Sequence, residues 1–186
     1  MRKLSAFIFI SLNGFFEASK GDISWHKHGE EENSYAIKSL KAGNTLLFGR
    51  KTYQMMANYW STPMAIENDP IVANGINKAA KIVFSRTLKK AGWNNTRIIK
   101  ANIVEEVKKL KKTSGSDMTL MGSGSILTRF AEQGLIDEYQ IMLDPVVLGK
   151  GATIFKDIKN KLNLKLITTR TFRSGIVLLS YRPAEK

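Results

Sequence analysis

The sequence contains no cysteine among its 186 residues. Disulfide bonds, thiolate nucleophiles and cysteine-ligated metal sites are therefore excluded. Its two histidines, His26 and His28, make a poor set of metal ligands, and we expect no bound metal. Proline is also scarce, and neither the four prolines nor the fourteen glycines gather into a linker. We therefore expect one domain spanning residues 1–186.

Long apolar runs are missing as well. No segment approaches the roughly 20 apolar residues that a membrane helix needs. Arg2 and Lys3 precede a short apolar run at residues 4–10, which has the look of a secretory signal. The run is short and no small-residue cleavage site follows it, so we expect a first strand instead. Together with the absence of cysteine, this favours a cytoplasmic protein without membrane partners.

Acidic residues are few beside the basic ones, 16 against 29, and the net charge is +13. A charge of this size attracts polyanions, including nucleic acid. Four lysines between positions 108 and 112 share a predicted helix with apolar residues, which is typical of a solvated helix face. No known nucleic-acid-binding motif accompanies them. A small anionic ligand is favoured, and a polyanion-binding protein remains an alternative.

The apolar pattern predicts strands that alternate with helices. Strands are expected at residues 4–12, 45–48, 81–84, 97–100, 118–121 and 139–143, and helices at 30–40, 50–59, 71–79, 103–112 and after residue 125. The segments 61–70 and 145–151 contain proline and are expected to be loops. Residues 164–172 and 176–181 predict a hairpin. The whole predicts an α/β fold with a mostly parallel sheet, helices on both faces and an antiparallel edge.

A glycine-serine turn follows the predicted strand at 118–121. Gly122, Ser123, Gly124 and Ser125 lead into a helix whose first apolar residue is Ile126. Backbone N–H groups at a helix N-terminus attract anions, and glycine lets a phosphate approach closely. The spacing differs from the dinucleotide fingerprint of doubly wound folds. A plain strand-to-helix turn is an equally open interpretation.

Two other strand ends carry basic turns. Gly49, Arg50, Lys51 and Thr52 follow one strand, and Ser85 and Arg86 follow another. In parallel sheets ligands bind beyond the carboxyl ends of the strands, and the arginine fork suits a monoester phosphate. Three anion-binding turns at one edge would hold the phosphates of NADPH. Taken alone, each arginine is explained equally well as a solvent-exposed residue at the end of a helix or strand.

Six motifs in order resemble the dihydrofolate reductase superfamily, and more closely the reductase domain of riboflavin biosynthesis, which is often fused to a deaminase. They are ISLNG at 10–14, LFGRKTY at 47–53, VFSR at 83–86, MGSGS at 121–125, LIDE at 135–138 and DPVVLGKG at 144–151. The resemblance implies a single-domain, three-layer fold of the dihydrofolate reductase type. It also implies hydride transfer from NADPH to a heterocycle or a ribosylamino-pyrimidine. The glycine turn would hold the cofactor pyrophosphate, and the arginine turns the adenosine phosphate.

The resemblance extends to the substrate side. It implies substrate contacts from Asn13, Trp25, Tyr53 and Met56, although a methionine in such a place is more often ordinary packing. Glu30 lies five positions after Trp25, where folate reductases carry a buried carboxylate, and is the candidate catalytic acid. The intervening residues lack the proline of that family, and an acidic first helical turn also explains Glu30.

Several alternatives stay open. The protein is expected to take a small-molecule substrate, as a riboflavin-type reductase or as a pterin reductase of the dihydrofolate reductase type. A protein of the same fold that has lost catalysis and binds a ligand or polyanion is the other possibility. A homodimer is compatible with all of them.

Overall fold

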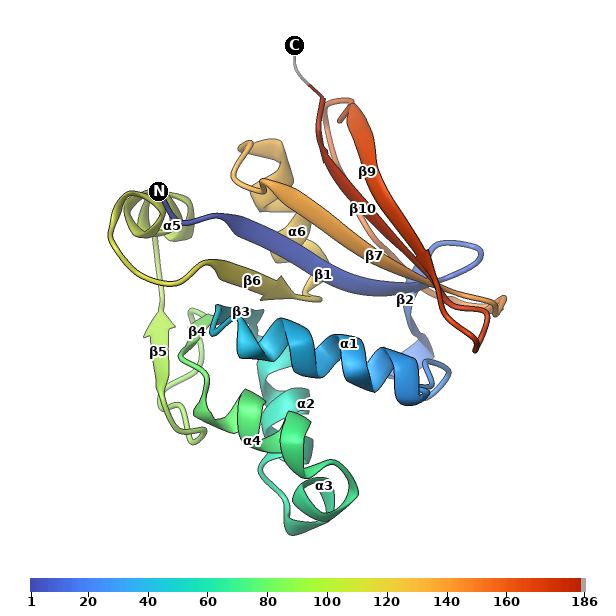
Figure 1. Cartoon of the computed structure of the whole chain (residues 1–186). Coiled ribbons are helices and arrows are strands. Elements are labelled where there is room, and N and C mark those ends of the chain that lie inside the picture. The colour runs from blue at the N-terminus through green and yellow to red at the C-terminus, as the bar shows by residue number, and fades with distance from the viewer. Residues whose placement is uncertain (185–186) are drawn as a thin grey trace.

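A computed structural model describes residues 1–184. One sheet of eight strands crosses the molecule in the order β5-β4-β3-β6-β1-β7-β10-β9 (Figure 1). The strands are β1 Leu4–Ser11, β3 Thr45–Gly49, β4 Lys81–Phe84, β5 Thr96–Ile99, β6 Met118–Met121, β7 Glu138–Asp144, β9 Leu164–Thr171 and β10 Val177–Pro183. Those from β5 to β7 are parallel, and β10 runs antiparallel to both β7 and β9. The predicted parallel sheet with a C-terminal antiparallel hairpin is confirmed.

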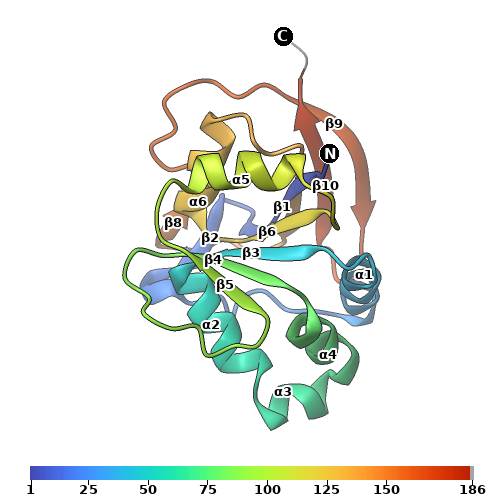
Figure 2. The same ribbon diagram turned by 90° about the vertical axis from the view of Figure 1, so that its left-hand side faces the viewer.

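Helices cover both faces of the sheet, which makes three layers (Figure 2). On one face lie α5 (Ile103–Lys112) and α6 (Gly124–Glu132), and their buried side chains pack against β1, β4 and β6. On the other face α1 (Glu30–Lys41), α2 (Arg50–Trp60) and α4 (Pro70–Lys78) contribute to a second core. Because both faces are covered, β3 and β4 are buried along their whole length.

The first strand shows how its sequence divides between the two faces. Leu4, Ala6 and Ile8 alternate into the core beneath α5 and α6. Phe7 and Phe9 point to the opposite face, where they and Tyr35 of α1 pack against a third cluster of buried residues. This two-residue period is the one expected of a strand whose faces meet different layers.

The expectation of a loop at residues 61–70 is wrong. The segment contains a short helix, α3 (Pro63–Asn68), and its end passes directly into α4. Each of the two helices has proline at its first position, where the missing N–H costs nothing. The side chains of Thr62 and Asp69 cap them by accepting hydrogen bonds from Ala65 N and Val72 N. The prolines therefore begin helices here instead of excluding them.

A second, two-stranded sheet lies outside the sequence prediction. It pairs β2 (Phe15–Ala18) with β8 (Gly151–Thr153), and the 3-10 turn η1 (Ser19–Gly21) follows β2. The strands approach so closely that a Cβ atom at Gly151 would lie 2.1 Å from the carbonyl oxygen of Glu17. Within residues 1–184, no helix is long and apolar enough to cross a membrane.

Candidate active site

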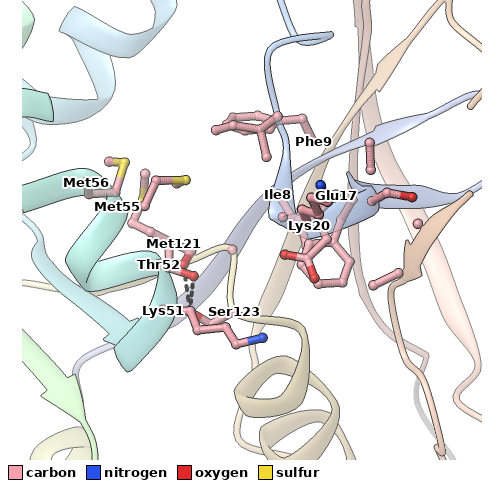
Figure 3. Close-up of a pocket in the computed structure, with 18 of the residues that line it drawn as sticks. Ile8, Phe9, Glu17, Lys20, Lys51, Thr52, Met55, Met56, Met121 and Ser123 are labelled. Carbon is pink, nitrogen blue, oxygen red and sulfur yellow. Dashed lines mark hydrogen bonds between the residues drawn. The ribbon is translucent and has the colours of Figure 1, made fainter. Parts of the chain in front are cut away.

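A cavity of about 790 Å³ opens between α2 and the small β2–β8 sheet. Met55 and Met56 enter it from α2, Glu17 and Lys20 from the opposite side, and Phe9 from β1 (Figure 3). Its aromatic and methionine lining residues are Phe7, Phe9, Phe16, Met55, Met56 and Met121. Its charged groups are Glu17, Lys20, Lys51 and Lys150. Such a mixture suits a flat, partly apolar ligand that carries negative charge.

Ser123 ties two helix N-termini together at the edge of this cavity. Its hydroxyl oxygen accepts a hydrogen bond from Gly49 N at 2.7 Å and lies 2.9 Å from the hydroxyl of Thr52 (Figure 3). Helix α2 begins just after Gly49 and helix α6 just after Ser123. The first turn of each helix leaves N–H groups without partners inside the helix, and both ends carry partial positive charge. The two helices therefore direct their anion-attracting ends at one place.

The glycines of this turn permit unusually close packing. Gly122 has φ +52°, a left-handed conformation that favours glycine. A Cβ atom at Gly124 would lie 2.9 Å from the ring of Phe16, so the aromatic ring rests on the first residue of α6. Ser123 itself adopts φ +65° although it is not glycine. Gly122 and Ser123 of this turn line the cavity.

Arg50 and Arg86 of the two predicted basic turns lie at neighbouring strand ends, outside the cavity lining, whereas Lys51 and Thr52 of the first turn line the cavity. Gly49 is paired in register with Phe84, so the ends of β3 and β4 are neighbours. Arg50 is exposed, and its guanidinium donates to Gln54 one helical turn away at 2.9 Å. Arg86 is exposed too, whereas the hydroxyl of Ser85 accepts from the amides of Thr87 and Leu88. Ser85 thus caps its own turn, and the arginines remain accessible from solvent.

Of the four residues expected to contact the substrate, one lines the cavity and three do not. Met56 lines the cavity. Tyr53 is 3% exposed, and its hydroxyl accepts from Trp93 N in the core. Asn13 is exposed and bonds the backbone of Leu148 through both its amide nitrogen and its amide oxygen. Trp25 donates to the carbonyl of Asp22. None of these last three residues, Tyr53, Asn13 and Trp25, lines the cavity.

The candidate acid Glu30 begins α1, is exposed and lies outside the cavity lining. Of its acidic neighbours, Glu31 pairs with Arg173, and the buried Glu32 accepts from Gly29 N and the Ser174 hydroxyl. The carboxylate that does line the cavity is Glu17, which sequence reasoning missed because β2 was not predicted. Lys20 and Lys150 were missed for the same reason, since the β2–β8 sheet brings them there.

Similar proteins agree with this architecture. The chain matches the family model of the RibD C-terminal domain over residues 2–178. It is 34% identical over 180 residues to the uncharacterized protein YyaP of Bacillus subtilis (strain 168), covering 97% of this chain and 94% of that one. A putative riboflavin biosynthesis protein from Shewanella sp. PV-4 superposes with a TM-score of 0.77 at 19% identity, covering 98% and 99% of the two chains. Dihydrofolate reductase from Enterococcus faecalis, solved with NADP(H), gives 0.67 at 16% identity, covering 98% and 97%. The predicted dihydrofolate reductase-like fold is confirmed.

Proposed function

The chain belongs to the RibD C-terminal domain family, and from that premise we propose that it is an NADPH-dependent oxidoreductase acting on a small planar heterocycle. A ribosylamino-pyrimidine of the riboflavin-pathway type is the substrate class we favour. One observation carries the proposal. The N-termini of α2 and α6 meet through Ser123 at the edge of a cavity of about 790 Å³ with aromatic walls. This pairs an anion-binding edge with space for a flat ring.

The residues at this edge fit NADPH. The amides that begin α2 and α6 would hold the pyrophosphate, because the first turn of each helix leaves N–H groups without partners inside the helix. Arg50 and Arg86 would hold the extra phosphate, since both are exposed at neighbouring strand ends. The dihydrofolate reductase of the same fold was solved with NADP(H). When bound, NADPH supplies the hydride.

The remaining lining residues suit the substrate side of a reduction. Aromatic and methionine walls exclude water, and their flat faces accept a heterocyclic ring. Lys20 and Lys150 extend from the small sheet and would attract an anionic group on the substrate. Among residues 1–184, Glu17 is the only residue with a carboxyl group that lines the cavity. We propose that Glu17 donates the proton that the substrate takes up after hydride transfer.

A pterin reductase of the dihydrofolate reductase type is the second candidate, favoured by the TM-score of 0.67 to that enzyme. The same walls accept a pteridine as well as a pyrimidine.

The experiment that tests both candidates measures oxidation of NADPH at 340 nm across a panel of ribosylaminopyrimidines and dihydropterins. Turnover of the pyrimidines supports the proposal, and turnover of the pterins alone supports the second candidate. Tight NADPH binding without turnover of any compound would favour a protein that has kept the fold and lost catalysis. Failure of NADPH to bind at all would overturn the proposal.

A further inference from the structure

A histidine and an aspartate form a buried pair close to the cavity, and the proposed reaction does not use them. Nδ1 of His26 lies 2.8 and 2.9 Å from the two carboxylate oxygens of Asp144. The side chains are 2% and 4% exposed. Asp144 ends β7 beside Ser11 of β1, at the carboxyl edge of the sheet. A carboxylate that accepts at Nδ1 sets the tautomer and prevents the imidazole from rotating.

The imidazole held in this way covers one face of a cavity residue. The rings of His26 and Phe9 are stacked, with centroids 3.8 Å apart and planes within 10° of parallel. Phe7 and His28 meet Phe9 edge-on, with ring centroids at 5.9 and 6.2 Å. Phe9 lines the cavity, whereas His26 and Asp144 do not. A continuous series of contacts therefore runs from the Asp144 carboxylate through two rings to the cavity wall.

The other nitrogen of His26 has no partner. Nε2 is the one buried side-chain nitrogen or oxygen among residues 1–184 without a hydrogen bond. Besides Phe9, the His26 ring has two aromatic neighbours: the ring centroid of His28 lies 4.4 Å away and that of Trp25 lies 6.1 Å away. Burial lowers the pKa of His28, and the nearby His26 lowers it further. An unsatisfied buried nitrogen costs stability. An apolar ring would avoid that cost but would leave the buried Asp144 carboxylate without its donor.

We propose that His26, oriented by Asp144, is a positioning residue that fixes the ring of Phe9 as the flat wall against which the planar substrate stacks. This inference rests on the proposed function. Stacked rings prefer defined offsets and separations, so a rigid Phe9 sets where the substrate ring lies. The angle between the hydride donor and the acceptor carbon depends on that position, and small displacements in such geometry reduce rate strongly.

The test compares the unaltered protein with His26→Asn, Phe9→Leu and the double variant. Asparagine places an N–H near the position of Nδ1, so Asp144 keeps a donor while the stacked ring is removed. His28→Asn is the matched control, because it removes a neighbouring imidazole that does not stack on Phe9. Asp144→Asn is the second variant: it keeps the imidazole and replaces the charged acceptor with a neutral one.

The first readout needs no substrate. In protein with ¹³C-labelled phenylalanine rings, the signal missing from Phe9→Leu identifies Phe9 among the nine phenylalanines. We expect that signal to shift most in His26→Asn, and to shift less in Asp144→Asn and in His28→Asn, since the His28 ring meets Phe9 only edge-on. An unchanged Phe9 signal in both His26→Asn and Asp144→Asn overturns the proposal.

The second readout is affinity for lumazine, a fluorescent pteridine, and for NADP⁺. Lumazine should bind on the order of fivefold more weakly to His26→Asn and to Phe9→Leu, the scale of one stacking contact. The double variant should be no weaker than Phe9→Leu, because His26 acts through Phe9. NADP⁺ affinity should be the same in all of them. Losses that multiply in the double variant overturn the proposal. If lumazine fails to bind the unaltered protein, a pteridine substrate is contradicted, and the Phe9 signal still decides the positioning role.

Discussion

At the scale of single residues, Arg50 and Arg86 are the side chains that we propose distinguish NADPH from NADH. Both are exposed at adjacent strand ends. Replacing the one that contacts the extra phosphate with glutamine should cost NADPH binding ~1.5–3 kcal/mol, the range for a charged hydrogen bond. NADH binding should change much less. Titration calorimetry of both cofactors measures the difference. Arg182→Gln, an exposed arginine on β10, serves as the control. Equal affinity of the unaltered protein for NADH and NADPH would contradict the assignment.

Gly124 gives a second test of the same edge. A methyl group in Gly124→Ala would meet the Phe16 ring at 2.9 Å and must displace it. We expect an overpacking cost of ~1–3 kcal/mol in stability, and weaker NADPH binding in a protein that still folds, because the displaced ring lies at the start of α6. Gly92→Ala is the matched control, since a Cβ there meets nothing within 4 Å. Gly122 is unsuitable, because its φ of +52° would strain any substitute. Circular dichroism checks that the variants fold, and titration measures their affinity for NADPH. An unchanged affinity in Gly124→Ala would mean that the turn has only a structural role.

Glu17 and Glu30 are the two candidate proton donors, and substitution of each distinguishes between them. Glu17 lines the cavity, and Glu30 is exposed at the start of α1. With a substrate in hand, Glu17→Gln should lower kcat by about 10²-fold or more, the range for general acid catalysis, and leave NADPH affinity unchanged. Glu30→Gln should cost only ~0.3–1 kcal/mol of stability through the helix dipole. Steady-state kinetics and urea unfolding of both variants measure these effects. The reverse pattern would restore Glu30 as the catalytic acid.

At the scale of elements, a buried lysine joins α4, β4 and the loop before β5. Lys81 is 1% exposed, and its ammonium donates to the carbonyls of Asn77, Ala79 and Asn94 at 2.9, 2.8 and 3.3 Å. It also lies 4.6 Å from the centre of the Trp93 ring. Burial lowers the pKa of Lys81 from 10.5 to about 8. One side chain thus connects three segments through contacts made with its charged form.

This shift predicts how stability depends on pH. Between pH 8 and 10.5 the unfolded chain binds the proton of Lys81 more tightly than the folded one, so the free energy of unfolding should rise with pH. Lys81→Met removes the titrating group. The stability of the unaltered protein relative to Lys81→Met should increase across that window by about 3 kcal/mol and stay level below pH 8. Urea unfolding at pH 7, 8, 9 and 10 measures it. A difference that does not change with pH means that the bonded carbonyls offset the cost of burial.

At the scale of the whole molecule, the net charge of +13 raises the question of a polyanion partner. Part of this positive charge is paired within the protein, because Lys108, Lys109 and Lys111 form salt bridges with carboxylates. We expect binding to duplex DNA at 50 mM salt to collapse by about 10³-fold or more at 200 mM, as counterion release requires, while NADPH binding persists. Fluorescence anisotropy with labelled DNA and NADPH titration at both salt concentrations test this. DNA affinity that survives 200 mM salt would favour the nucleic-acid alternative.

The sequence by itself determined the elements whose signals are local. Strand β6 and helix α5 occupy the residues predicted for them, 118–121 and 103–112. The parallel sheet and the turns at its carboxyl edge follow from the same patterns, because an apolar period and a glycine turn report neighbours a few positions apart. The ordered motifs were enough to identify the fold, which the comparisons confirm.

Only the tertiary structure decided which residues meet. Glu17 and Lys150 reach one cavity through the pairing of β2 and β8, strands too short to show a period. Ser123 joins the starts of two helices 74 positions after Gly49, and His26 meets Asp144 across 118 positions. Contacts of this range leave no periodic trace in the chain, because they depend on how whole elements pack rather than on the identity of adjacent residues. The turns at the carboxyl ends of the strands could therefore be predicted from sequence, whereas the cavity between them and the small sheet could not.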